Sequence, residues 1–285
     1  MWVEILVYGA VTSAIYSMLA VGFTLVFGVA RVLNLAHGSF YAIGAYLAYL
    51  FAVQLHWPLA LAALASVCLS ALFGLLVERF LVRRQRASQL AVLMLTLGLS
   101  LIIEQALLLG FGSEVRNVPA FIEDKFSIFG ADVSGQRLLT LGASILLLGG
   151  LWLTIQRTRL GAAILAISQD PLAAQYMGIP IDRIYGWVFA LSAGFSAAAG
   201  VLAGPFMSVQ PAMGLVAMTK AFAIVIVGGI GSLPGSLLAA LLLGYSETLV
   251  AYLISSSWTE VVSLAAVLTT LLLRPAGLMG KRAAF

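Results

Sequence analysis

Nine apolar stretches, most of them close to the length that a lipid bilayer requires, divide this sequence. A hydrocarbon core about 30 Å thick takes roughly 20 apolar residues of helix. Free backbone groups find no water in lipid, so each stretch that crosses should be helical. The sequence predicts an all-α, polytopic transmembrane helical bundle with eight or nine spans, some of them broken. The stretches cover residues 5–29, 37–55, 58–77, 88–111, 138–156, 185–207, 213–231, 234–255 and 259–273.

Composition agrees with a membrane protein. The chain is 62% hydrophobic and only 9% charged, whereas soluble domains average roughly 25% charged residues. We expect residues 1–285 to form a single transmembrane domain. The net charge of +4 lies mostly on arginines in short loops, so it does not indicate nucleic acid. The single cysteine, Cys68, excludes a disulfide framework.

Basic residues in short loops predict the orientation, because such loops stay in the cytoplasm. Loop 78–86, segment 157–184 and the tail are rich in Arg and Lys, the tail through Arg274, Lys281 and Arg282. Loop 112–137 has no basic excess, so it should face outward. The side of the N-terminus stays unassigned at this stage.

Two breaks interrupt the apolar pattern. The first is Arg31-Val-Leu-Asn-Leu-Ala-His-Gly38, and the second is Val227-Gly-Gly-Ile-Gly-Ser-Leu-Pro-Gly235. Glycine and proline at this density cannot form a stable helix interior. Each break leads into a helix of small residues, 37–48 and 231–244, and paired interruptions of this kind indicate a transport pathway between two repeats. Ordinary packing of small residues is the alternative.

Polar side chains in the first break predict a hinge beside the pathway. Asn34 and His37 are three residues apart, so in a helix they share a face. Polar groups at membrane depth are costly unless they meet partners or water. They would line or gate the path, or alternatively cap a helix. A metal site is not expected, because His56 is the only other histidine and no Cys or His cluster is present.

Segment 157–184 predicts a short docking helix on the cytoplasmic side. Asp170 can cap a helix that begins at Pro171, and Gly178 followed by Pro180 ends it near Met177. Its apolar side chains favour contact with a cytoplasmic partner over a helix that only closes a loop. These side chains are Leu172, Tyr176, Met177 and Ile179.

Three charged residues, Glu104, Lys220 and Glu247, lie well inside apolar stretches. Each costs roughly 2.5–3.5 kcal/mol at the centre of a bilayer. They should therefore face the bundle interior or a partner subunit, and we expect structural ion pairs. A proton relay would need a spaced chain of acids and histidines, which the sequence lacks.

At these motifs the sequence resembles the LivH-type permeases of the branched-chain amino acid ABC-transporter family. The resemblance covers nearly the whole chain. Its marks are Asn34-Leu-Ala-His-Gly38 with Gly44-Ala-Tyr46, then Thr158-Arg-Leu-Gly161 leading to Asp170, Ala174 and Gly178-Ile179, and then Gly228-Gly-Ile-Gly-Ser232 with Gly235. Each motif alone is weak, and their order along the chain makes the set specific.

The resemblance implies a function and a set of partners. The chain would be a LivH/LivM-type permease that moves branched-chain amino acids across the bacterial inner membrane. Its partners would be a LivM-like second permease, two cytoplasmic ATPase subunits, and a periplasmic or lipid-anchored solute-binding protein. The chain itself would hold no cofactor, metal or catalytic residue, because ATP and Mg would bind to the ATPases.

Two groups of site residues follow from the breaks and the resemblance together. The first would line the translocation pathway or act as hinges: Asn34, His37, Gly38, Gly44, Gly228, Gly229, Gly231, Ser232 and Gly235. The second would couple the permease to the ATPases: Arg159, Gly161, Asp170, Ala174 and Gly178.

Alternatives stay open at this point. The same importer class could carry urea, short amides or other amino acids. A secondary transporter or channel would need its own coupling-ion or selectivity site and would not need a docking helix. An intramembrane enzyme would need clustered catalytic groups, which the sequence lacks.

Overall fold

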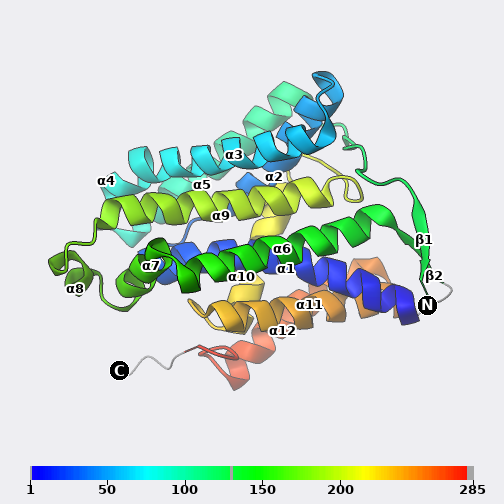
Figure 1. Cartoon of the computed structure of the whole chain (residues 1–285). Coiled ribbons are helices and arrows are strands. Elements are labelled where there is room, and N and C mark those ends of the chain that lie inside the picture. Colours follow the sequence, from blue (N-terminus) through cyan, green and yellow to red (C-terminus); the bar gives the residue numbers. More distant parts are fainter. Residues whose placement is uncertain (1, 129–130, 281–285) are drawn as a thin grey trace.

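The computed structural model describes residues 2–128 and 131–280 and shows a helical bundle with one small hairpin (Figure 1). The elements, in chain order, are α1 (Trp2–Ala30), α2 (His37–Tyr49), the π-helical turn η1 (Leu50–Gln54), α3 (Leu59–Val77), the π-helical turn η2 (Glu78–Val82), α4 (Arg83–Gln85), α5 (Gln89–Phe111), β1 (Lys125–Ile128), β2 (Ala131–Ser134), α6 (Gly135–Arg157), α7 (Arg159–Gln169), α8 (Pro171–Tyr176), α9 (Ile181–Ala203), α10 (Met213–Gly228), α11 (Leu233–Leu253), the 3-10 turn η3 (Ser256–Trp258) and α12 (Thr259–Leu273).

Seven helices in the described part of the chain are long and apolar enough to cross a bilayer. Two apolar helices are shorter, α2 with 13 residues before η1 and α10 with 16; α2 follows the first break, and α10 comes directly before the second. The seven long helices with these two short ones agree with the prediction of eight or nine spans, some of them broken. The chain is therefore a multi-pass membrane protein with an all-α bundle.

The two ends of the bundle carry different segments (Figure 1). The N-terminus lies beside the hairpin β1–β2, and the Arg137 guanidinium stacks 3.8 Å from the ring centre of Tyr8 there. Helices α4, α7 and α8 lie at the opposite end, together with the C-terminal segment. The predicted cytoplasmic segments thus share one end, called the α8 end below, while Lys281 and Arg282 fall outside the described residues.

Two segments predicted as loops contain regular structure. Loop 112–137 holds the antiparallel hairpin, in which Lys125 pairs with Ser134. Loop 78–86 continues α3 through η2 and α4, because Glu78 is held inside the bundle. Its carboxylate pairs with Arg86 and lies 3.4 Å from Arg83 Nη2, and both arginines also meet Asp182 at the start of α9.

The bundle contains two halves with the same helix order. A long buried helix leads through an extended segment into a short helix and then two further helices: α1, α2, α3 and α5 in the first half, and α9, α10, α11 and α12 in the second. The packing matches as well, since α1 lies along α11 as α9 lies along α3. In Figure 1, α1 runs toward the α8 end and α9 runs away from it, so the halves have inverted directions.

This arrangement corrects the internal pairing predicted from sequence. Residues 37–48 were matched with 231–244, but 231–244 belong mostly to α11, the counterpart of α3. The counterpart of α2 is α10, and the break equivalent to 31–36 is 204–212. The sequence prediction paired the first break with 227–235 because both contain glycines, whereas the equivalent of the first break is 204–212.

Candidate translocation path

Helices α2 and α10 begin with the same backbone geometry and cross at their first turns. Ala36 and Ala212 precede them with φ/ψ of −76°/−2° and −77°/−4°. A Cβ on Gly38 would lie 2.0 Å from the carbonyl oxygen of Gly214. Only glycine permits this approach, so Gly38 is required for the crossing at the centre of the bundle.

His37 is fully buried and has both ring nitrogens hydrogen-bonded. The Leu19 carbonyl can only accept, so Nε2–H donates to it at 3.0 Å, and Nδ1 accepts from the Ser192 hydroxyl at 3.1 Å. Ser196 donates to the His37 carbonyl at 2.8 Å. The imidazole thereby joins α1, α2 and α9, and it lines neither of the two cavities described below.

Asn34 is also buried, at 1% exposure. Its Oδ1 accepts from the Ala36 backbone N–H at 3.1 Å, which shapes the turn before α2. Its Nδ2 has no partner among the described residues. Gly44 lies further along α2, where a Cβ would approach the Ala197 carbonyl oxygen to 2.4 Å. It serves close packing of α2 on α9.

The second break lies at the α8 end, away from the α2–α10 crossing. Gly228 and Gly235 pack backbone to backbone, since a Cβ on Gly228 would lie 2.5 Å from the Gly235 carbonyl. Gly229 and Gly231 have φ of 102° and 82°, which L side chains rarely adopt. The Ser232 hydroxyl accepts from the Gly235 N–H at 3.2 Å and caps α11.

The chain after α12 returns to this break. Leu278 N–H donates to the Val227 carbonyl at 2.8 Å, and Met279 N–H donates to the Gly228 carbonyl at 3.0 Å. These bonds satisfy the last carbonyl groups of α10, which the helix itself leaves free. The two breaks therefore do not meet each other, and the structure brings each of them against α1 instead: Gly22 lies near His37 and Gly28 near Gly231.

Two cavities lie on either side of this arrangement. One, of about 180 Å³, is bounded by α1, α2, the 204–212 break and α10. The other, of about 230 Å³, lies at the α8 end between α1, α6, α7 and the second break, where Gly231 and Ser232 line it. Among the predicted pathway residues, only these two line either cavity.

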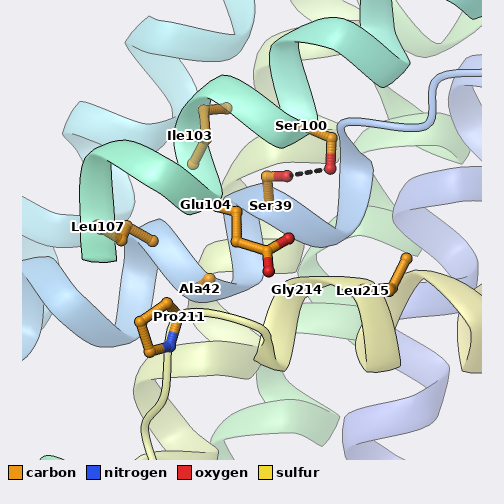
Figure 2. A pocket seen from close by; sticks show the side chains of 9 residues that line it. All are labelled: Ser39, Ala42, Ser100, Ile103, Glu104, Leu107, Pro211, Gly214 and Leu215. Atoms are coloured by element: carbon orange, nitrogen blue, oxygen red, sulfur yellow. Dashed lines mark hydrogen bonds between the residues drawn. The ribbon is translucent and has the colours of Figure 1, made fainter. Parts of the chain in front are cut away.

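Glu104 lies in a third and much smaller space, drawn in Figure 2. Its carboxylate extends from α5 toward the first turn of α10 at Gly214, close to the hydrogen bond of 2.9 Å from Ser39 to Ser100. The space holds about 10 Å³, enough for about one water molecule. Glu104 has no ion pair with the residues that the structure describes, so for this residue a pair with a partner subunit stays a prediction.

The other two charges inside apolar stretches form the expected ion pair. Lys220 Nζ lies 2.6 Å from Glu247 Oε1 and donates to the Ser263 hydroxyl at 2.9 Å. Tyr16 donates to the second carboxylate oxygen of Glu247 at 2.5 Å. This cluster joins α1, α10, α11 and α12.

The predicted coupling segment has the predicted helix. Asp170 Oδ1 accepts from the N–H groups of Leu172 and Ala173 at 2.9 and 3.1 Å, and α8 ends before Gly178, whose φ is +81°. The sequence missed α7, which Thr158 caps by accepting from the Gly161 N–H. Gly161 is required because a Cβ there would lie 2.1 Å from the Ile155 carbonyl.

One face of α8 is open. The exposed fractions of Leu172, Tyr176 and Met177 are 67%, 88% and 83%, whereas Ala174 is buried against the bundle. Arg159 is exposed at the start of α7. Apolar side chains exposed together at the end of a bundle mark a contact surface.

A polytopic bundle with inverted halves, two short helices that begin at its centre and an exposed helix at one end defines the class of a membrane permease. The model of the family "Branched-chain amino acid transport system / permease component" matches residues 5–271. The chain belongs to this family.

Curated relatives agree along the whole chain. The permease protein BraD of Pseudomonas aeruginosa, from a high-affinity branched-chain amino acid transport system, is 32% identical and covers 98% of this chain and 96% of its own. The permease protein LivH of Escherichia coli is 30% identical, covering 96% and 94%. LivM of Salmonella typhimurium is 32% identical over 84% of this chain and 62% of its own length.

A solved structure shares the fold. PsaBC from Streptococcus pneumoniae in complex with Fab superposes with a TM-score of 0.53 at 14% identity, covering 96% of this chain and 93% of that one. This likeness concerns the fold alone.

Sequence reasoning missed the 204–212 break and the crossing glycine Gly214. A signal was present, because Ala212-Met-Gly214 repeats the pattern of Ala36-His-Gly38, and Gln210 takes the place of Asn34. The replacement of His37 by Met213 made the second motif look like an ordinary apolar run.

Proposed function

We propose that this chain is a permease subunit of an ABC importer that moves branched-chain amino acids across the bacterial inner membrane. Family membership over residues 5–271 supports the transport class, and the names of the relatives supply the substrate. The observation that carries the mechanism is the exposed apolar face of α8, whose first turn is capped by Asp170. A helix presented in this way suits a partner that pushes or pulls on the bundle.

Two cytoplasmic ATPase subunits that bind ATP and Mg would dock at α7 and α8 and supply the driving force. Arg159, Gly161, Asp170, Ala174 and Gly178 would shape this coupling segment rather than react with nucleotide. A physical link into the membrane exists, since α8 leads directly into α9, and Asp182 there meets the arginines that hold Glu78. Movement of α8 would thus be passed to α3 and α9 together.

A second, LivM-like permease would complete the membrane part, and a periplasmic or lipid-anchored binding protein would deliver substrate at the hairpin end. In this reading, the α2–α10 crossing is the rigid centre beside the path, and Asn34, His37, Gly38 and Gly44 hold it in place while the neighbouring segments move. Gly228, Gly229, Gly231, Ser232 and Gly235 would form the turn that moves at the α8 end.

Reconstitution tests this proposal. The chain, its second permease, the two ATPases and the binding protein are purified and placed in sealed vesicles, and uptake of radiolabelled leucine is followed. We expect uptake only with hydrolysable ATP and with all subunits present. Uptake by this chain alone would contradict the proposal and favour a secondary transporter. Uptake of urea, a short amide or another amino acid in place of leucine would keep the importer class and change the substrate.

A further inference from the structure

The cavity of about 180 Å³ between α1, α2 and α10, called the α10 cavity here, is large enough for a small solute. By the same measure a water molecule needs roughly 10–15 Å³, so the cavity has room for roughly ten or more water-sized groups. Its lining includes Tyr16, Leu19, Tyr41, Met213, Ala217 and Lys220.

One wall of the α10 cavity is apolar. Ile15, Leu19 and Met213 are buried at 1%, 2% and 6% exposure. An aliphatic side chain of four or so carbons would fill this region, at a gain of about 0.8 kcal/mol for each buried CH₂. The wall alone would accept any small hydrocarbon, so the polar residues must set the specificity.

Lys220 supplies a donor at the other side. Its ammonium has three N–H donors, and two of them bind Glu247 and Ser263. Lys220 lines the cavity while Glu247 and Ser263 do not. The third N–H is therefore free for a solute, and a carboxylate forms the strongest hydrogen bond with such a donor.

Acceptors lie on the α1 and α2 side. The Tyr16 hydroxyl donates its only proton to Glu247, which leaves its lone pairs able to accept a hydrogen bond. The Tyr41 hydroxyl donates to the Met207 sulfur at 3.5 Å, which also leaves its lone pairs for a donor. A primary ammonium group would satisfy these oxygens.

The position of the cavity matches a solute in transit. The 204–212 break bounds the cavity, and this break follows α9 at the hairpin end of the bundle. There, Val209 and Arg116 exchange backbone hydrogen bonds. Ile15 and Leu19 lie halfway along α1. A solute that enters at the hairpin end would thus meet the cavity near the middle of the bundle.

We propose that the α10 cavity is a transient binding site for an aliphatic α-amino acid, in which Lys220 anchors the carboxylate, Tyr16 and Tyr41 accept from the ammonium group, and Ile15, Leu19 and Met213 contact the side chain. This inference rests on the proposed function and assigns its substrate a place inside this chain. In the first half, His37 occupies the position that corresponds to Met213, and both of its ring nitrogens are hydrogen-bonded.

Thermal unfolding of the purified whole complex, without binding protein, measures occupancy directly, since a ligand that binds only the folded state raises the midpoint. The probes are leucine, 4-methylpentanoate, which lacks the ammonium group, and 3-methylbutylamine, which lacks the carboxylate. We expect millimolar leucine to raise the midpoint and the two fragments to raise it much less. Equal shifts from 3-methylbutylamine and leucine would overturn the role of Lys220.

Cavity-filling variants locate the site. Ala217→Leu and Met213→Phe add volume inside the cavity, and we expect each to abolish the shift with leucine. Leu242→Phe, an increase similar to that of Met213→Phe but at an exposed position on α11, should leave the shift unchanged. The double variant Lys220→Met/Glu247→Leu removes both charges together, so no charge is left unpaired, and it should lose the leucine shift as well. Loss of the shift in Leu242→Phe would contradict the assignment.

Transport separates this inference from the proposed function. In vesicles, we expect Ala217→Leu to lower leucine uptake about tenfold, as the loss of about 1.4 kcal/mol of binding would, while ATP hydrolysis stimulated by the binding protein continues. Normal uptake by both Ala217→Leu and Met213→Phe would overturn the site and leave the importer function standing. Failure of the unaltered complex to take up leucine, together with a midpoint shift from leucine, would support the site and contradict the proposed function.

Discussion

The stretch from α1 to α2 and the stretch from α9 to α10 have the same backbone course but different side chains. Both short helices begin after an alanine of nearly identical φ/ψ, and Gly38 and Gly214 face each other at the crossing. In the first half, His37 satisfies both ring nitrogens and closes the space beside it. In the second half, Met213 lines a cavity. The same backbone course therefore holds a fully hydrogen-bonded side chain, His37, in the first half and borders a cavity, at Met213, in the second.

The charged cluster of the second half offers the strongest test of this difference. Glu247→Ala should lower the free energy of unfolding by about 3–5 kcal/mol, because it leaves the Lys220 ammonium buried without its partner. The position on α2 that corresponds to Lys220 is Gly44, which has no charge to lose. Thermal unfolding followed by gel filtration measures the effect. Lys220→Met/Glu247→Leu is the control, and stability as low as that of Glu247→Ala would contradict the ion-pair explanation.

The glycines at the crossing should respond unequally. A Cβ on Gly38 would lie 2.0 Å from the Gly214 carbonyl oxygen, whereas a Cβ on Gly214 would lie 3.0 Å from the Gly38 carbonyl oxygen. Overpacking lowers the free energy of unfolding by about 1–3 kcal/mol. We expect a loss near the upper end of this range for Gly38→Ala and near the lower end for Gly214→Ala. The yield of monodisperse protein and its unfolding midpoint report the difference. Equal losses would show that the two halves are equally tight.

Exchange of His37 and Met213 tests whether the side chain, rather than the backbone, makes the halves differ. His37→Met should cost about 2 kcal/mol, because the Leu19 carbonyl and the Ser192 hydroxyl lose a buried partner. Met213→His should cost less, since the cavity gives the imidazole room. The unfolding midpoints of the two single variants are compared. A larger loss for Met213→His would reverse the interpretation.

The smallest effect on stability is expected for a substitution in α8, which lies outside both halves in the segment that connects them. Tyr176 is 88% exposed on α8, so Tyr176→Glu should change the free energy of unfolding by less than about 0.5 kcal/mol. The same change should abolish copurification with the ATPases, because it places a charge in an apolar contact. Gln175→Glu, at a neighbouring exposed position, is the matched control. Full retention of the ATPases by Tyr176→Glu would contradict the coupling role.

Several features could be predicted from sequence because they depend on local chemistry. Residues around α8 specify its cap and its end through Asp170, Pro171 and Gly178, and the structure confirms them. The Lys220–Glu247 ion pair could also be predicted from sequence, since a charge inside an apolar stretch must find a partner. At Glu104 the carboxylate extends toward α10 and has no ion pair with the described residues, so the pair that the rule predicts there would have to come from a partner subunit.

The amino-acid sequence by itself determined the membrane class, the approximate number of spans, the positions of the break before α2 and of the break between α10 and α11, and the short helix α8. These follow from hydrophobic length, helix-breaking residues and caps, all of which act within a few residues along the chain. Only the tertiary structure decided that α10 is the counterpart of α2, that His37 is locked by Leu19 and Ser192, and that a cavity lies beside Met213. These features depend on which backbones approach each other across the bundle. In the sequence, a close approach such as that of Gly38 to Gly214 is visible only as a glycine, which does not say which partner it contacts.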